Sequence, residues 1–281
     1  MDKYLIIGRG YIGTYLNSNI KDSILTPDKL YRFYRTQDVI EVLKNYPDYI
    51  VINAAGTTGR PNIDWCETNK AETVVGNIAL PLMIAEACEE LDMYLINIGS
   101  GCIYDGYEKE WTEEDVPNFE GSFYSKCKKI SQELVSEFKN TCTLRIRMPI
   151  SETMGERCLI SKLVKYSING WPILSDRKNS MTYLGDLASS ISAVAEKRTT
   201  GTFNVVNDGP ITPVDTLRIY KEIVDNDLTW TEMKYNDFKF KAERSNCVLS
   251  NKKIKSLGVD MPSITKRISD MLKIKVNKGE L

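Results

Sequence analysis

Two stretches of the chain carry side chains that could move protons. In "GSFYSKCKKI", Tyr124 and Lys128 stand four residues apart, which places both on one face of a helix. A free tyrosine has a pKa of about 10, so acting near neutrality needs a shift of about three units, or about 4 kcal/mol. A neighbouring ammonium group and the positive nicotinamide of an oxidised dinucleotide would supply such a shift. The pair therefore predicts an acid–base site, provided that the chain binds a dinucleotide.

The second stretch, "IGSGCIYDG" (98–106), places Cys102 two residues after Ser100 at the expected end of a strand. On an extended segment, residues i and i+2 point to the same side, so both side chains would face one ligand. A thiol has a pKa of about 8.5 and can act as a base near neutrality when a lysine lies nearby. The alternative is a structural cysteine, since cysteine is among the most buried residue types.

A glycine loop supplies the dinucleotide prediction. "YLIIGRGYIGTYL" places Gly8, Gly10 and Gly13 as G-x-G-x-x-G between a short apolar strand and a helix. The first glycine permits the turn, the second lets a pyrophosphate approach the backbone, and the third lets the helix pack on the strand. The candidate cofactor contacts of the loop and of the later strand end are Gly8, Gly10, Tyr11, Ile12, Gly13, Asn53, Ala54 and Ala55.

The segment "DSILTPDKLYRFYRTQD" (22–38) bears on which dinucleotide is bound. Asp28 would hold the ribose hydroxyls of NAD, whereas Lys29, Arg32 and Arg35 favour the additional phosphate of NADP. The alternative for each basic residue is a solvated side chain. We predict NADPH, with Arg35 as a contact, and NADH as the alternative.

The elements that must position these residues alternate along the chain. Apolar runs at 4–8, 48–56, 93–101 and 142–149 are separated by helical patterns, and further strand and helix patterns occupy 202–208 and 184–197. Runs that are apolar nearly throughout are typical of strands covered on both faces. The pattern predicts an α/β fold with a Rossmann-type doubly wound parallel sheet and a smaller C-terminal substrate-binding lobe. We predict a dinucleotide-binding domain over 1–149, rejoined by about 176–207, and a lobe made of 150–175 and 208–281.

Composition excludes several classes of function. The 281 residues carry a net charge of −1, which gives no reason to expect nucleic acid as a partner. No apolar run suggests a spanning helix, so we expect no membrane partner. The seven cysteines are scattered, which favours free thiols, a reducing compartment and hence a cytoplasmic location, and we expect no metal site. The absence of histidine excludes Ser-His-Asp hydrolysis and imidazole acid–base chemistry.

The motifs together resemble a known family. "NAAGTTGRPNIDWCETNKAET", "GCIYDG", "VPNFEGSFYSKCK", "CTLRIRMPIS", "NSMTYLGDL" and "RSN" occur in the order found in the bifunctional UDP-4-keto-6-deoxy-D-glucose 3,5-epimerase/4-reductases. That family belongs to the extended short-chain dehydrogenase/reductase superfamily and is related to dTDP-4-dehydrorhamnose reductase. The similarity runs from about residue 3 to about residue 275, although the glycine loop is one residue shorter than the family's usual G-x-x-G-x-x-G.

The resemblance implies roles for individual residues. Ser100, Tyr124 and Lys128 would form the reductase triad, with Tyr124 protonating the C4 oxygen of the sugar and Lys128 holding the cofactor ribose and depressing the tyrosine pKa. Cys102 and Lys162 would carry protons for inversion at C3 and C5; without the resemblance, Lys162 is an ordinary helical lysine. UDP-4-keto-6-deoxy-D-glucose would be the substrate and UDP-L-rhamnose the product. Many members of the superfamily are dimers, so a homodimer is a further alternative that the sequence leaves open.

Substrate contacts are expected from four places in the chain. The candidates are Arg60, Asn62, Asp64, Asn77, Ser100, Arg244 and Asn246. Two rival functions remain open on the sequence: a 4-reductase that takes an already epimerised ketone, and a dinucleotide-binding regulatory subunit without chemistry. The intact triad argues against the second.

Overall fold

A six-stranded sheet forms the centre of the computed structural model, which describes residues 2–27 and 35–281. All six strands are parallel, in the order β2-β1-β3-β4-β6-β8. They are β1 (Lys3–Ile7), β2 (Ser23–Leu25), β3 (Tyr49–Asn53), β4 (Leu95–Ser100), β6 (Thr141–Ile146) and β8 (Gly201–Asn204). The predicted Rossmann-type parallel sheet is confirmed.

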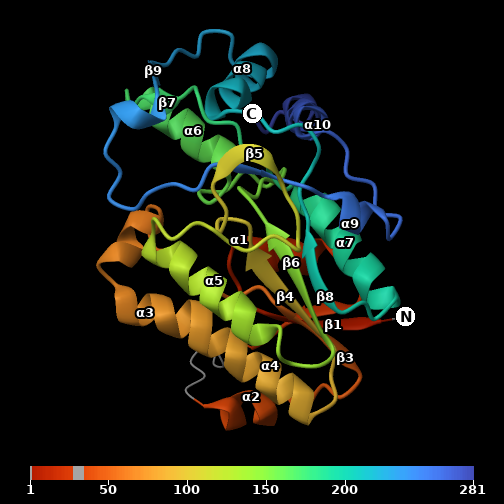
Figure 1. Cartoon of the computed structure of the whole chain (residues 1–281). Helices are drawn as coiled ribbons and strands as arrows, with labels where there is room; N and C mark the ends of the chain where they lie inside the picture. The colour runs from red at the N-terminus through yellow and green to blue at the C-terminus, as the bar shows by residue number, and fades with distance from the viewer. Residues whose placement is uncertain (1, 28–34) are drawn as a thin grey trace.

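Helices cover both faces of this sheet (Figure 1). Side chains alternate along β1: Tyr4 and Ile6 pack in one core cluster with α1 and α7, whereas Leu5 and Ile7 pack in a second cluster with α2, α4 and α5. The helices are α1 (Tyr11–Asn19), α7 (Leu184–Glu196), α2 (Thr36–Leu43), α4 (Leu80–Glu90) and α5 (Phe123–Val135). Burial on both faces explains why the strand runs are apolar nearly throughout.

Residues 70–90 form one continuous helical stretch. It consists of α3 (Lys70–Val74), a π-helical turn η3 (Val75–Ala79) and α4. By length and composition it could cross a membrane, with a mean hydropathy of 1.3, so the prediction that no such run exists is wrong. Ile84 and its neighbours on the inner face pack in the second core cluster, and a core helix meets the same criterion.

A smaller lobe lies beyond the carboxyl edge of the sheet, at the top of Figure 1. One core cluster joins α6, α8 and α10 with the small sheet β7–β9, and a separate two-stranded sheet pairs β10 with β5. The lobe contains α6 (Leu159–Ile168), β7 (Ile173–Leu174), α8 (Pro213–Ile223), β9 (Glu232–Met233) and α10 (Ile264–Asn277). The remaining elements are η2 (Ile63–Glu67), which contacts α3 and α5, β5 (Gly106–Trp111), η4 (Tyr235–Asp237), β10 (Cys247–Leu249) and α9 (Lys252–Lys255), which packs against β8. The predicted domain boundaries stay a prediction.

The strand order reverses between β1 and β3, because β2 lies on the far side of β1. In open α/β sheets, ligands bind outside the carboxyl ends of the strands at such a point. Ile7 pairs with Asn53 there, and β4 and β6 end at Ser100 and Ile146 along the same edge. The strand predicted over 142–149 is shorter than expected because Met148 has a φ of 41°, which ends the extended backbone.

Candidate active site

The glycine loop has the geometry that a dinucleotide requires. Gly8 has a φ of 114°, and a Cβ there would lie 2.6 Å from the amide nitrogen of Ala55. A Cβ on Gly13 would lie 1.8 Å from the carbonyl oxygen of Gly8, so only glycine lets α1 approach the turn. A Cβ on Gly10 would meet no heavy atom within 4 Å, which leaves open space above the backbone at the position where a pyrophosphate would approach.

The amino-terminal end of α1 completes this cradle. Gly10 is its N-cap, no side chain caps the helix, and the first turn holds no acidic residue that would repel a phosphate. Asn53, Ala54 and Ala55 lie beside the loop, since the Ala54 amide donates to Ile7 and the Ala55 amide donates to the Asn53 side chain. These residues therefore fit a bound dinucleotide phosphate.

Two other predicted cofactor contacts have structural partners. The Tyr11 hydroxyl lies 2.8 Å from Ser151 Oγ, which connects the glycine loop to the segment after β6. Ile12 packs against the first core cluster. Arg35 is 76% exposed and forms an ion pair with Asp38 at 2.9 Å.

The predicted candidates Asp28, Lys29 and Arg32 lie outside the described residues. The structure adds Arg9, which the sequence analysis missed. Its Nε donates to the carbonyl oxygen of Thr26 at 3.1 Å, so the guanidinium lies beside the carboxyl end of β2. This is the place where an arginine accommodates the additional phosphate of NADP.

Ser100, Tyr124 and Lys128 lie together where β4 ends and α5 begins. Ser122 caps α5 by accepting a hydrogen bond from the Ser125 amide at 3.1 Å, which starts the helix at the residue before Tyr124. The Ser100 hydroxyl, at the end of β4, is close enough to the Tyr124 phenol to lower its pKa. Lys128 lies one turn further along, and its Nζ donates to the carbonyl oxygen of Ile98 at 3.3 Å.

Burial dominates the electrostatics of Tyr124 and Lys128. Burial and the neighbouring Cys102 raise the pKa of Tyr124 above its ordinary value, and only Ser100 opposes them. Burial also lowers the pKa of Lys128 to about 8. In the chain without a cofactor, Lys128 is itself desolvated and donates to a backbone carbonyl, and it is not among the groups that lower the tyrosine pKa. Its effect on Tyr124 with a cofactor bound stays a prediction.

Cys102 lies in a turn rather than on an extended segment. The Gly101 amide still donates to Ile146, but the chain then turns, and the Cys102 amide donates to Ser100 Oγ at 3.1 Å. The argument from extended backbone is therefore wrong, although the thiol still neighbours Tyr124, whose pKa it raises. Cys102 is half-buried, whereas the other six cysteines are buried and all seven are free thiols.

Lys162 is half-buried on α6. Burial and the neighbouring Arg157 lower its pKa, against the influence of Cys158. Within residues 2–27 and 35–281, its ammonium makes no hydrogen bond or ion pair. The guanidinium of Arg157 donates to the carbonyl oxygen of Gly59 at 2.6 Å, which bridges the start of this lobe to the loop after β3.

The predicted substrate contacts largely bind one another. Asp64 and Arg244 form an ion pair at 2.9 Å that joins the loop after β3 to the C-terminal segment, and this pairing contributes to the lowered pKa of Asp64. Asn62 caps η2 by accepting from the Asp64 amide at 2.8 Å. Arg60 is exposed.

Two predicted asparagines have structural hydrogen bonds. Asn77 is buried and bonds both the amide and the carbonyl of Thr57, at 3.1 and 2.7 Å, so it shapes the loop after β3. Asn246 is buried, donates to the Arg244 carbonyl at 2.7 Å and accepts from Asn179 at 3.2 Å. Both side chains therefore hold loop structure, and their predicted contacts with substrate stay a prediction.

The sequence analysis also missed residues that support Ser100, Tyr124 and Lys128. Glu67 Oε1 accepts from the Phe123 amide at 2.7 Å, at the first residue of α5, where a carboxylate interacts favourably with the helix dipole. Asn97 Oδ1 accepts from Asn53 at 2.9 Å, which links β3 to β4 beneath the site. The sequence shows Glu67 and the strand asparagines Asn53 and Asn97, but no local pattern indicates which amide groups their side chains contact.

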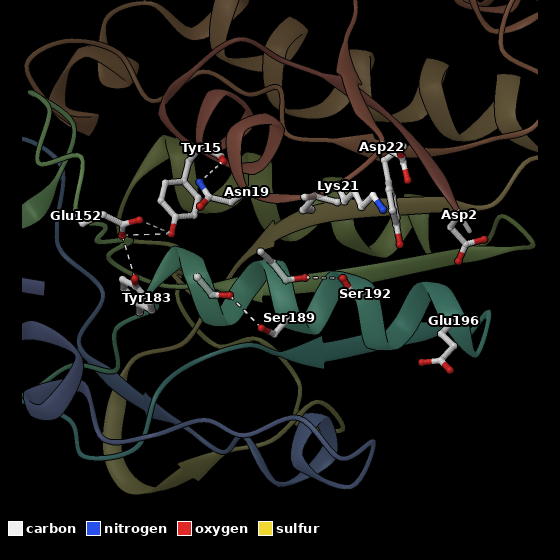
Figure 2. A pocket seen from close by; sticks show the side chains of 14 residues that line it. Asp2, Tyr15, Asn19, Lys21, Asp22, Glu152, Tyr183, Ser189, Ser192 and Glu196 are labelled. Atoms are coloured by element: carbon white, nitrogen blue, oxygen red, sulfur yellow. Dashed lines mark hydrogen bonds between the residues drawn. The ribbon is translucent and has the colours of Figure 1, made fainter. Parts of the chain in front are cut away.

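A cavity of about 750 Å³ lies away from this site, between α1 and α7 (Figure 2). At one end Glu152 accepts hydrogen bonds from the phenols of Tyr15 and Tyr183, each at 3.0 Å. Asp2 and Glu196 lie at the other end. The lining contains none of the predicted catalytic residues, and the carboxylate of Glu152 is already bonded, so we assign the chemistry to the carboxyl edge of the sheet.

Comparisons with known proteins identify the family of the chain. The family model described as the RmlD substrate binding domain matches residues 4–276. The bifunctional dTDP-4-dehydrorhamnose 3,5-epimerase/dTDP-4-dehydrorhamnose reductase of Arabidopsis thaliana is 36% identical over 275 residues, which cover 93% of this chain and 89% of that protein.

Two crystal structures have the same fold. The UDP-rhamnose synthase of Acanthamoeba polyphaga mimivirus has a TM-score of 0.86 at 30% identity, and the match covers 96% of this chain and 98% of that one. The dTDP-4-dehydrorhamnose reductase of Bacillus anthracis, in complex with NADP, has a TM-score of 0.84 at 17% identity and covers 99% of both chains. Since the family match runs through both the sheet and the lobe, the chain belongs to the RmlD substrate binding domain family.

Proposed function

We propose that the protein converts UDP-4-keto-6-deoxy-D-glucose to UDP-L-rhamnose by inverting C3 and C5 and reducing the C4 ketone with NADPH. The observation that carries this proposal is the grouping of Ser100, Tyr124 and Lys128 with the half-buried thiol of Cys102 at one sheet edge. The likeness to a bifunctional epimerase/reductase over most of both chains supports it.

NADPH, held at the glycine loop, would supply the hydride for C4. Ser100 and Tyr124 would donate hydrogen bonds to the C4 oxygen, and Tyr124 would transfer its proton to that oxygen as negative charge develops. A raised pKa keeps the Tyr124 phenol protonated and therefore able to donate. Lys128, one helical turn away, would bind the ribose hydroxyls and return a proton to the phenol.

Inversion at C3 and C5 depends on the same C4 ketone that is reduced. The C3 and C5 protons are acidic because each carbon neighbours the C4 carbonyl, so a base removes one and leaves an enolate that is reprotonated on the other face. The chain has no histidine for this step. Cys102, beside the group that binds the carbonyl oxygen, is the proposed base, and Lys162 is the proposed second proton carrier.

The cofactor assignment rests on the loop and on basic side chains near the end of β2. Gly10 leaves room for a pyrophosphate, and Arg9 lies where a 2′-phosphate would bind. The NADP complex of the Bacillus anthracis reductase supports NADPH over NADH. The UDP assignment is supported by the mimivirus synthase, whereas the Arabidopsis relative is named for dTDP sugars, so turnover of both nucleotide sugars should be compared.

The Cys102→Ala variant separates the two activities. We expect it to reduce UDP-4-keto-L-rhamnose, which is already epimerised, at the wild-type rate, but to produce no rhamnose from UDP-4-keto-6-deoxy-D-glucose. Product analysis by chromatography and NMR reads both reactions. If the variant retains full activity on the second ketone, the protein is a 4-reductase that leaves inversion to another enzyme.

We further propose that the protein is a homodimer joined through α5. Ile130 and Leu134 of this helix are 42% and 41% exposed, and η3, which contacts α5, carries Val75 at 55% exposure. An antiparallel pairing of α5 with a second copy would bury this apolar face and bring exposed Lys126 opposite Glu133 of the partner subunit. Light scattering should report a dimer that Ile130→Glu converts to a monomer; a monomeric wild type would refute this.

A cytoplasmic location is also proposed. All seven cysteines are free thiols and six are buried, as expected in a reducing compartment. Fractionation of the source cells, with immunodetection of the protein, tests this location.

A further inference from the structure

Residues 235–246, here called the strap, join the smaller lobe to two loops at the carboxyl edge of the sheet. The strap runs from η4 to β10 and crosses between the lobe and the sheet (Figure 1). The Ala242 amide donates to Asp64 Oδ1 at 3.0 Å, in the loop after β3. The Glu243 amide donates to the carbonyl oxygen of Gly121 at 3.1 Å, just before α5. The strap therefore borders the place where a sugar would meet the start of α5.

An ion pair closes the strap against the loop after β3. Arg244 and Asp64 approach to 2.9 Å, and their side chains are 23% and 33% exposed. Burial raises the pKa of Asp64, but the bonds from Arg244 and from the Ala242 amide outweigh it and the pKa is lowered, so Asp64 is a carboxylate at neutral pH. A partly solvated ion pair of this kind contributes little to stability. A ligand with a stronger negative charge can therefore take the place of the carboxylate.

The position of Arg244 is fixed by groups other than Asp64. The Arg244 amide donates to the Tyr235 hydroxyl at 3.0 Å, and that hydroxyl donates to the Arg244 carbonyl oxygen at 3.2 Å. The guanidinium lies 5.0 Å from the ring centre of Phe240, which stacks on Tyr235 at 5.2 Å, and it also donates to the carbonyl oxygen of Ala242. Loss of Asp64 would leave this guanidinium in place with its charge unbalanced.

The surroundings of the pair carry more cations than anions. The guanidinium of Arg157 donates to a backbone carbonyl of the same loop at 2.6 Å, and no carboxylate within residues 2–27 and 35–281 forms an ion pair with it. Arg60 and Lys241 are exposed, and Lys241 helps to lower the pKa of Asp64. Glu243 is the other carboxylate of the strap beside the pair, and it is exposed. The charge balance around Asp64 therefore favours an anionic ligand.

A nucleotide sugar would present such an anion at this place. C1 lies across the sugar ring from C4, so a diphosphate on C1 extends away from the phenol that binds the C4 oxygen. Arginine presents a planar pair of donors that suits carboxylate and phosphate alike. We propose that Asp64 occupies Arg244 in the free chain as a stand-in for the substrate's diphosphate, which displaces it when a nucleotide sugar binds. This inference rests on the proposed function, because it takes a nucleotide sugar as the substrate.

Titration with UDP tests the proposal without turnover. Asp64→Asn removes the competing charge but keeps an oxygen that accepts from the Ala242 amide. Calorimetry should show a Kd for UDP that is about two- to fivefold lower, the range that a partly exposed ion pair contributes, and an unchanged Kd for uridine, which has no phosphate. Arg244→Met should raise the Kd for UDP about 10- to 150-fold. UDP binding that is not tightened in Asp64→Asn, or not weakened in Arg244→Met, overturns the proposal.

Two controls separate this site from other anion sites. Glu120→Gln removes the carboxylate of a surface pair with Lys129 at 2.8 Å, next to Gly121, and should leave the Kd for UDP unchanged. An equal tightening in this variant would show a general effect of charge and overturn the proposal. The Kd for NADPH should be the same in Asp64→Asn as in the wild type; a parallel change would mean that the pair faces the cofactor's pyrophosphate instead.

Further measurements keep the test decisive. If Asp64→Asn does not fold, Asp64→Ser also removes the charge and keeps an oxygen acceptor, with the same expected result. dTDP is titrated beside UDP, because both carry the diphosphate, and a wild type that binds neither overturns the proposal. Binding is read without chemistry, so failure of inversion or reduction would be seen separately, as missing deuterium in the sugar or missing rhamnose.

Discussion

The substitution Gly10→Ala tests the glycine loop directly. Gly10 has a φ of −77° and a ψ of −172°, which any residue adopts, and a Cβ there would meet no heavy atom within 4 Å. Alanine therefore fits the folded chain without strain. Because it also reduces the conformational entropy of the unfolded chain, we expect the free energy of unfolding to stay constant or to rise by about 0.4–1 kcal/mol.

The same methyl group would fill the space through which a pyrophosphate approaches the backbone. Loss of one hydrogen bond to a charged phosphate oxygen costs about 1.5–3 kcal/mol. Since 1.4 kcal/mol corresponds to a tenfold change, the Kd for NADPH should rise about 10- to 150-fold. NADPH fluorescence titration gives the Kd, and thermal unfolding gives the stability of the same samples.

Gly13→Ala is the matched control. Its Cβ would lie 1.8 Å from the carbonyl oxygen of Gly8, so α1 must move and the fold itself should lose stability. The two variants thus separate binding from folding within one loop. If Gly10→Ala binds NADPH as tightly as the wild type, no phosphate approaches the backbone at this position and our account of the loop is refuted.

Three further substitutions have expected outcomes. Tyr124→Phe removes the proton donor and should lower kcat for ketone reduction about 10²- to 10⁴-fold in steady-state kinetics, whereas strong turnover would exclude this role. Lys128→Met removes a group whose pKa of about 8 in the fold is below its ordinary 10.5. Below pH 8 the charged, desolvated lysine therefore lowers the free energy of unfolding of the wild type by up to about 3 kcal/mol, and this penalty disappears as the pH rises to 10.5. The Lys128→Met variant should have the higher Tm below pH 8, and the difference in Tm should vanish by pH 10.5. A difference in Tm that does not change with pH would contradict the assignment. Glu67→Gln weakens the bond to the Phe123 amide by about 1 kcal/mol and should lower Tm by about 2–4 °C; an unchanged Tm would show that the contact is not stabilising.

Local sequence pattern predicted the parts of the site that depend on local structure. The glycine spacing reflects steric requirements of one turn, and the structure shows them at Gly8 and Gly13. The pairing of Tyr124 with Lys128 follows from helix geometry, and the place of Ser100 follows from the end of β4. The order of strands and helices could also be predicted, because a strand that is buried on both faces is apolar nearly throughout.

Contacts between distant segments were not predictable in this way. The turn at Cys102 depends on Gly101 packing over Arg147, 46 positions along the chain, and no local pattern encodes that contact. Asp64 and Arg244 were both predicted to meet substrate, but their mutual ion pair depends on how the C-terminal segment crosses the lobe. Desolvation of Lys128 likewise depends on the whole fold, so no local pattern could show it.

The central claim is that one chain carries both inversion and reduction. The purified protein would be incubated with UDP-4-keto-6-deoxy-D-glucose in D₂O, with and without NADPH, and deuterium at C3 and C5 would be read by NMR. Our account predicts deuterium at both carbons without NADPH, and UDP-L-rhamnose when NADPH is present. Absence of exchange, with NADPH oxidised only after a separate epimerase is added, would contradict it and leave the protein a reductase alone.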